Sequence, residues 1–116
     1  MGGLGETWEC EYKFRVEREH VAEHLAAEGE YVLSTPCLIL YMERAARMCL
    51  DSRTGKVSVG YRVDMKHRKS VPPGRELTLY ARVFYWDGRR ALVYVRAEDD
   101  TGSLVGEGIN ERFAKS

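Results

Sequence analysis

The segment from Ser34 to Ala46, STPCLILYMERAA, constrains the fold more than any other part of the chain. Thr35 suits the N-cap of a helix, and Pro36 suits the first helical position, where its missing N–H costs nothing. Six consecutive apolar residues follow and leave no polar face, so the first half of this helix must be buried. We therefore expect a central helix from Pro36 to about Leu50.

A single carboxylate, Glu43, directly follows this apolar run. Burying a charge is expensive unless the group is paired or protonated. Carboxylates in such surroundings are candidates for functional sites. The alternative interpretation is an ordinary helix-surface ion pair between Glu43 and Arg47, four residues further on.

Alternation of apolar and polar residues predicts about five strands in the rest of the chain. The first runs from Trp8 to Val16, and a short helical segment around residues 21–27 stops at Gly29. Asp87-Gly88 predicts a two-residue hairpin turn. The other strands are expected near residues 57–67, 77–85, 91–97 and 104–113. Strict alternation would place on one face the side chains of Val57, Val59, Tyr61, Val63, Met65 and His67.

These elements predict an α+β fold of one domain over residues 1–116, in which an antiparallel five-stranded sheet curls around a long central helix. Leu77, Leu79, Ala81, Val83 and Tyr85 are expected to face the helix. A second apolar face is expected on the outer side of the sheet, and its burial by another subunit would explain it. Its members are Tyr80, Phe84, Trp86, Leu92 and Tyr94.

Composition excludes several classes of partner. Eighteen basic and eighteen acidic residues cancel, so no global charge favours a nucleic acid or an anionic membrane. No apolar run approaches the roughly 18 residues of a membrane span. The three cysteines, Cys10, Cys37 and Cys49, are odd in number and lack CxxC spacing. We expect a soluble cytoplasmic protein with reduced thiols.

Thr35, Glu43 and His67 together supply a hydroxyl, a carboxylate and an imidazole, the three groups of a hydrolytic site. Each residue also has a structural explanation: an N-cap for Thr35, the Arg47 pair for Glu43, and the end of a strand beside a basic turn for His67. The basic turn itself, Lys66 to Lys69, could meet the phosphates of coenzyme A or could simply be solvated.

With this spacing the chain resembles the hot-dog-fold acyl-CoA thioesterases, specifically the fluoroacetyl-CoA-thioesterase-like family. The resemblance runs from the first strand to Arg112. It rests on Ser34-Thr35-Pro36 with Met42-Glu43, on Ser58-Val59-Gly60 followed by His67, and on the final stretch Gly106 to Arg112.

The resemblance implies roles for five residues. The matching Thr, Glu and His are catalytic in that family, which assigns catalysis to Thr35, Glu43 and His67. The matching Gly and Arg line and support the site, which assigns substrate binding to Gly60 and Arg112. Coenzyme A would enter as part of the substrate, with no other cofactor and no metal. The segment before Thr35 lacks the phenylalanines that gate the fluoroacetyl-specific pocket, so a different acyl group is expected.

Helix geometry adds a constraint that does not depend on the resemblance. Thr35 and Glu43 are eight residues apart, about 12 Å along a helix axis, so one helix cannot bring both to the same reacting atom. Either the substrate spans that gap, or the site combines residues of two chains. The resemblance implies the second case, because hot-dog dimers place their active sites at the subunit interface. We therefore expect a homodimer with a composite site, and the outer face favours its assembly into a homotetramer.

Three alternative functions remain. His20, Glu23 and His24 match an HxxEH zinc pattern, although their short segment is also explained as the polar face of an amphipathic turn. A non-catalytic acyl-CoA-binding domain would need the fold but not Glu43 and His67 together. A hydroxyacyl or enoyl thioester dehydratase would pair Asp64 with His67, yet these two residues are expected on opposite strand faces.

Overall fold

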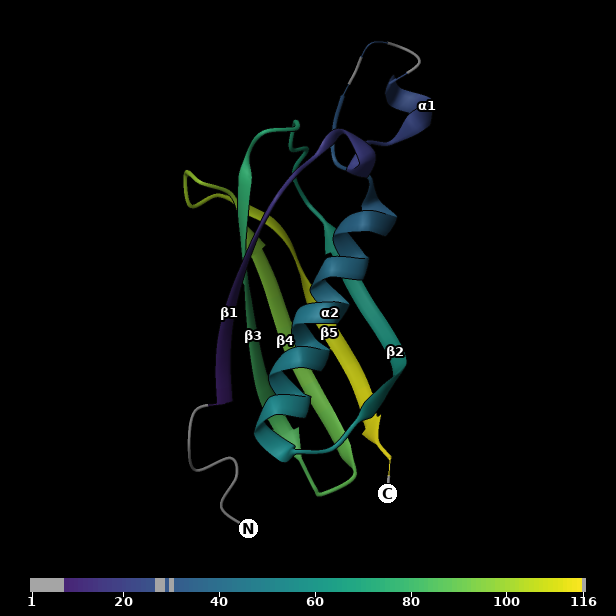
Figure 1. Ribbon diagram of the computed structural model, residues 1–116, viewed down its shortest axis with the longest axis vertical. Coiled ribbons are helices and arrows are strands. Elements are labelled where there is room, and N and C mark those ends of the chain that lie inside the picture. Colours follow the sequence, from purple (N-terminus) through teal and green to yellow (C-terminus); the bar gives the residue numbers. More distant parts are fainter. Residues whose placement is uncertain (1–7, 27–28, 30, 116) are drawn as a thin grey trace.

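The computed structural model describes residues 8–26, 29 and 31–115. Five antiparallel strands form one sheet in the order β1-β3-β4-β5-β2, and one long helix, α2, packs across its inner face (Figure 1). This is the predicted α+β architecture. The strands are β1 (Trp8–Arg15), β2 (Ser58–His67), β3 (Glu76–Trp86), β4 (Arg90–Glu98) and β5 (Leu104–Ala114). The helices are η2 (Arg18–His20), α1 (Glu23–Ala26) and α2 (Thr35–Thr54).

The long helix begins and ends differently from the prediction. Ser34, not Thr35, is the N-cap, and its side chain accepts a hydrogen bond of 3.2 Å from the Cys37 N–H. Because Ser34 serves as the cap, the hydroxyl of Thr35 is left for another partner. The helix continues past Leu50 to Thr54, where Gly55 adopts a left-handed conformation (φ 71°) that ends it.

The core lies between α2 and the sheet. The helix buries an apolar side made of Leu38, Met42, Ala45, Ala46, Cys49 and Leu50. The sheet contributes the predicted inward residues of β3 and β4, Leu77, Leu79, Ala81, Val83, Ala91, Val93, Val95 and Ala97. No helix of the described residues has the length and apolar character needed to cross a membrane.

Two β-bulges correct the predicted strand faces. In β2 the register shifts between Gly60 and Arg62, and because a bulge adds one residue, the side-chain alternation reverses there. His67 still faces α2, but Val59 and Tyr61 lie on the outer side, where the Tyr61 ring contacts Phe113 edge-on. The prediction of one continuous face from Val57 to His67 was therefore wrong.

The second bulge lies between Val83 and Tyr85 in β3. It turns Tyr85 outward and Trp86 inward, the reverse of the prediction for both residues. The Trp86 ring packs against the core beside Trp8, with ring centroids 6.4 Å apart.

The outer face of the sheet keeps four of its predicted aromatic and aliphatic side chains but mixes them with charges. The Arg96 guanidinium lies 4.4 Å from the centroid of the Tyr80 ring. Arg90 forms an ion pair with Glu111 on the same face. The face is therefore less apolar than predicted, and a tetramer built on it stays a prediction.

The thiols are not all reduced in the structure. A disulfide joins Cys10 of β1 to Cys49 of α2, and Cys37 is the free cysteine. The sequence missed this pair because 39 residues separate the two positions, which only the packing of β1 on α2 brings together. The cytoplasmic location stays a prediction, and this bridge argues against it because disulfides are rare in the cytosol.

We predict that the variant Cys10→Ser, which cannot form the bridge, has a free energy of unfolding about 2–4 kcal/mol lower than the wild type, the usual effect of a disulfide closing a loop of this length. Urea denaturation without reductant measures the difference, and wild-type protein in reductant should fall to a similar value. Cys37→Ser is the matched control and should stay close to the wild type. Equal stability of all three proteins would contradict the prediction.

Candidate active site

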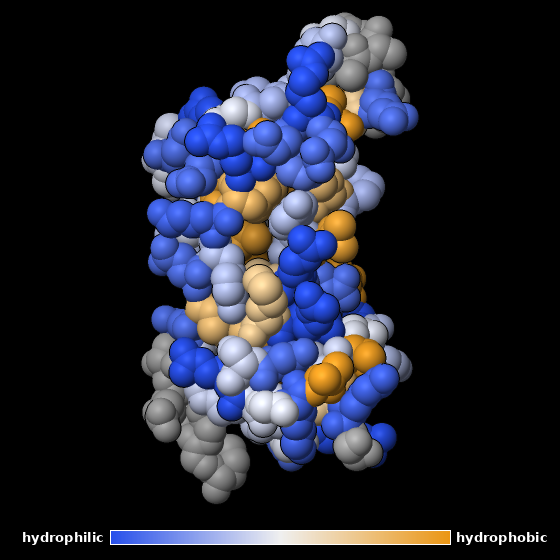
Figure 2. Space-filling model, in the orientation of Figure 1, coloured by the Kyte–Doolittle hydropathy of each residue, from blue (hydrophilic) through white to orange (hydrophobic). Residues whose placement is uncertain are grey.

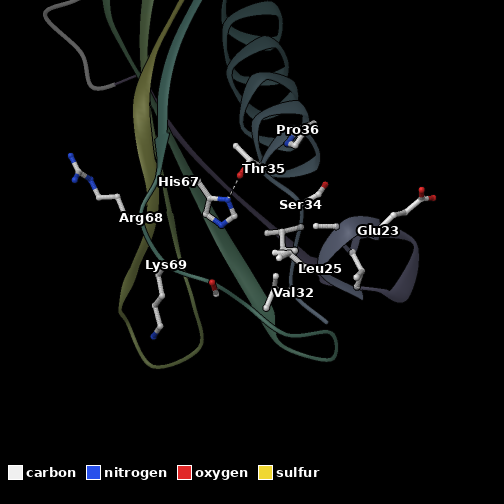
Figure 3. Close-up of a pocket in the computed structure, with 13 residues that line it drawn as sticks. Glu23, Leu25, Val32, Ser34, Thr35, Pro36, His67, Arg68 and Lys69 are labelled. Carbon is white, nitrogen blue, oxygen red and sulfur yellow. Dashed lines mark hydrogen bonds between the residues drawn. The ribbon is translucent and has the colours of Figure 1, made fainter. Parts of the chain in front are cut away.

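Thr35 and His67 meet at the start of α2. The Thr35 Oγ1 and the His67 Nδ1 are 2.8 Å apart and share a hydrogen bond. Thr35 comes from the first turn of the helix and His67 from the last residue of β2, so the packing of the helix on the sheet creates this contact. Figure 3 shows the two side chains directed at each other.

The other ring nitrogen of His67, Nε2, is buried and has no hydrogen-bond partner among the described residues. A buried polar atom without a partner is uncommon and calls for a ligand, a water or a catalytic role. Burial also lowers the pKa of His67. His67 is therefore neutral at pH 7, the state in which an imidazole can accept a proton.

A hollow of about 680 Å³ lies beside this pair. Its walls come from α1, from the segment that leads into α2, and from the chain that follows β2 (Figure 3). This volume is in the range of small-molecule sites. The hollow gives a substrate access to the Thr35 hydroxyl and the His67 ring.

Glu43 lies two helical turns further along and pairs with Arg112 of β5, with Oε2 and Nη1 3.4 Å apart. The alternative pair with Arg47 is not formed. Gly60 of β2 is adjacent, and a Cβ atom there would collide with the Glu43 Oε2. The absence of a side chain at this position therefore makes room for the carboxylate, whose side chain remains 34% exposed.

Arg112 is held from several sides. It is almost completely buried, donating from Nε to the Ser58 hydroxyl at 2.8 Å, from Nη2 to the Ser58 carbonyl at 3.1 Å, and from Nη1 to Asn110 Oδ1 at 3.1 Å. The Ser58 hydroxyl in turn donates to Asp51 at 2.6 Å. Burial lowers the pKa of Arg112, while the Glu43 carboxylate raises it.

Sequence reasoning did not single out Asp51, Ser58 and Asn110. The available signal was Asn110, a polar residue two positions before Arg112 in a predicted strand, and the structure shows Asn110 to be completely buried. Residues two positions apart in a strand share one face. A polar residue that shares a buried face with an arginine indicates a polar network, because buried polar groups require partners. Asp51 carries no such signal, since it looks like part of a polar turn, and Ser58 stands out only as part of the Ser58-Val59-Gly60 stretch of the resemblance.

The structure does not bring all five candidate residues together within one chain. Thr35 and His67 form one group, and Glu43, Gly60 and Arg112 form another. Two members of the second group, Glu43 and Arg112, line a separate hollow of about 240 Å³ together with Leu40, Arg44 and Arg47. Gly60 is not part of this lining. Eight helical residues separate Thr35 from Glu43, about 12 Å along α2.

Two other candidate features are occupied by internal contacts. His20 accepts a hydrogen bond from the Glu17 N–H at its Nδ1 (2.8 Å) and contacts the Tyr41 hydroxyl through Nε2 (3.3 Å), so neither nitrogen is available to a metal. Within the described part of the chain no His, Cys, Asp and Glu residues gather to form a metal site. In the basic turn, Arg68 pairs with Glu107 and Lys69 with Asp99.

The family model for the fluoroacetyl-CoA-specific thioesterase, FlK, matches residues 16–115. The chain therefore belongs to the fluoroacetyl-CoA-specific thioesterase family, and it is a thioesterase with the hot-dog fold. A comparison with curated proteins finds no match.

Solved structures agree with this assignment. A hypothetical thioesterase-superfamily protein of Thermus thermophilus is 25% identical, with a TM-score of 0.81 over 99% of this chain and 86% of its own. The fluoroacetyl-CoA thioesterase FlK is 25% identical, with a TM-score of 0.79 over 92% of this chain and 84% of its own. A Streptococcus pneumoniae TIGR4 hypothetical thioesterase solved with coenzyme A has a TM-score of 0.83 over 93% of this chain and 79% of its own, and at 11% identity it shows the fold alone.

We predict that His67 titrates below 6.5, the ordinary value for histidine. The unfolded chain then binds the proton more readily than the folded one, so the free energy of unfolding rises with pH in the range below 6.5. The stability that neutral His67 contributes is lost as the pH falls through this range. NMR of the imidazole nitrogens, assigned with the variant His67→Gln, measures the midpoint. A midpoint at or above 6.5 would contradict this account of the site.

Proposed function

We propose that the protein hydrolyses an acyl-CoA or acyl-carrier thioester to the free acid and the thiol. The observation that carries the proposal is the Thr35–His67 hydrogen bond at the wall of a ligand-sized hollow, with the other ring nitrogen of His67 bonded to none of the described residues. Membership of a thioesterase family supports the reaction type. Some of the solved relatives were studied with coenzyme A or acetyl-CoA, which supports coenzyme A as the carrier.

In the proposed reaction Glu43 acts as general base toward water, or attacks the thioester carbonyl directly to form a transient anhydride. Arg112, fixed by Ser58 and Asn110, holds the carboxylate in position. On the general-base route the proton taken from water passes through His67 to the leaving thiolate. On the anhydride route the thiolate leaves as the anhydride forms; water, giving its proton to His67, then cleaves the anhydride, which releases the acid and regenerates Glu43, and His67 protonates the thiolate. The Thr35 hydroxyl and the backbone N–H of Thr35 stabilise the developing oxyanion, aided by the positive end of the helix dipole.

This chemistry requires that Glu43 and the Thr35–His67 pair act on one thioester, and we propose that a homodimer achieves this. The supporting feature is β2, which lies at the edge of the sheet with one side unpaired (Figure 1). Apolar side chains are exposed along it, with Val59 at 46%, Tyr61 at 72% and Val63 at 39%. Exposed apolar edge strands are sites for pairing with another chain.

The register of such a pairing can be stated. Seven residues separate Gly60 from His67, so the two lie roughly 23 Å apart along β2. If two copies of β2 pair antiparallel about a two-fold axis between Val63 and Asp64, His67 of one chain lies opposite Gly60 of the partner subunit. Since Gly60 lies against Glu43 in each chain, this arrangement gathers the two separated groups at each of two equivalent sites. Figure 2 shows a hydrophobic patch over the region where β2 begins.

The alternative functions receive less support. Asp64 lies on the outer face with Arg62 and Ile109, so it does not converge with His67 as a dehydratase pair would require. A non-catalytic binding role leaves the Glu43–Arg112 pair without a function and does not fit a thioesterase family. The tetramer remains a proposal, for which the mixed outer face gives weaker support than the β2 edge gives for the dimer.

We predict that Glu43→Gln and His67→Gln each lower kcat/KM for thioester hydrolysis by about 10²–10⁴-fold, the usual contribution of a general acid or base. Release of free thiol from an acyl-CoA measures the rate. The matched control is Glu76→Gln, which alters an exposed carboxylate at the start of β3. If Glu43→Gln and His67→Gln retain the rate of this control, the assignment of both residues is wrong.

A further inference from the structure

The hollow beside Thr35 and His67 has one predominantly apolar wall. That wall is made by Val21, Ala22 and Leu25 on one side and by Val32, Leu33 and Pro36 on the other. Figure 3 shows Leu25 and Val32 next to each other, on the side of the hollow away from Arg68 and Lys69. A ligand group in contact with this wall gains most if it is itself apolar.

The charged residues around the hollow do not offer a site for an anion. Arg68 is paired with Glu107 at 2.7 Å, and Lys69 is paired with Asp99 at 2.6 Å. Glu23, the remaining charged residue of the described lining, is exposed and would repel a carboxylate. An acyl group that ends in a carboxylate or phosphate is therefore disfavoured relative to a hydrocarbon.

The size of the hollow leaves room for an acyl group much longer than two carbons. A water molecule occupies about 30 Å³ in the liquid, and a carbon of an acyl chain needs roughly the same volume. A chain of six to ten carbons therefore needs about 180–300 Å³. This is less than half of the 680 Å³ available, and the rest accommodates the thioester and the end of its carrier. An acetyl or fluoroacetyl group would leave the apolar wall in contact with water.

We infer that the hollow binds an aliphatic acyl chain of about six to ten carbons, with Leu25 and Val32 as the residues that determine chain length. The inference rests on the proposed thioesterase function, because the Thr35–His67 pair fixes where the thioester carbonyl lies and the chain extends from there along the wall. Each added methylene is expected to raise kcat/KM roughly fourfold until the wall is covered.

A series of linear acyl-CoAs from acetyl to dodecanoyl tests the inference by thiol release. In the wild type, kcat/KM should rise from acetyl to about octanoyl and then level off or fall. Leu25→Trp, which fills the wall, should lower the octanoyl-to-acetyl ratio of kcat/KM at least tenfold. Val32→Phe is a second variant in case Leu25→Trp does not fold, and Ile109→Trp, on the outer face of the sheet, is the matched control with an unchanged ratio.

The outcomes separate the inference from the proposed function. Two results would overturn the inference alone and point to the carrier arm as the occupant. One is hydrolysis whose kcat/KM stays flat or falls with chain length. The other is an octanoyl-to-acetyl ratio of kcat/KM that is the same in Leu25→Trp and Val32→Phe as in Ile109→Trp. Failure to hydrolyse any member of the series overturns the proposed function and the inference together. A rising profile that collapses only in the two wall variants supports both.

Discussion

The packing of α2 against the inner face of the sheet is the constraint on which the rest of the structure depends. A helix that buries Leu38 and Met42 in the sheet has its rotation and its position along the strands fixed, because protein cores tolerate little misfit. The same packing sets the Thr35 hydroxyl against His67 and directs Glu43 toward Arg112. The chemistry of the site is therefore a consequence of how the core is filled.

The bulge in β2 is the second element that positions the site. Without it, Gly60 and His67, seven residues apart, would face opposite sides of the sheet, since side chains alternate along a strand. The extra residue between Gly60 and Arg62 brings both onto the side of α2. The glycine then lies against the Glu43 carboxylate while the histidine lies against Thr35. A local irregularity that weakens the ladder thus allows one edge strand to serve both groups.

Much of the fold could be predicted because its signals are local. The apolar run that follows Pro36 and the alternation in β1, β3 and β4 each depend on neighbouring residues. What could not be predicted depends on long-range contacts: the bulge that reverses Tyr61, the pairing of Cys10 with Cys49, and the buried anchor of Arg112. The spacing of Thr35, Glu43 and His67 nominated these residues as candidates, but only the three-dimensional structure shows that Thr35 contacts His67 and that Glu43 contacts Arg112 instead of Arg47.

The central claim is that each site combines Glu43 of one chain with Thr35 and His67 of another. It is tested most directly by mixing the inactive variants Glu43→Gln and His67→Gln after unfolding and refolding them together. If the site is composite, half of the dimers are mixed and each has one intact site, so thioester hydrolysis should return to about a quarter of the wild-type rate. If each site lies within one chain, every chain in the mixture carries a defect. Activity that stays at the level of the separate variants, while size and mass measurements show mixed dimers, would contradict the account.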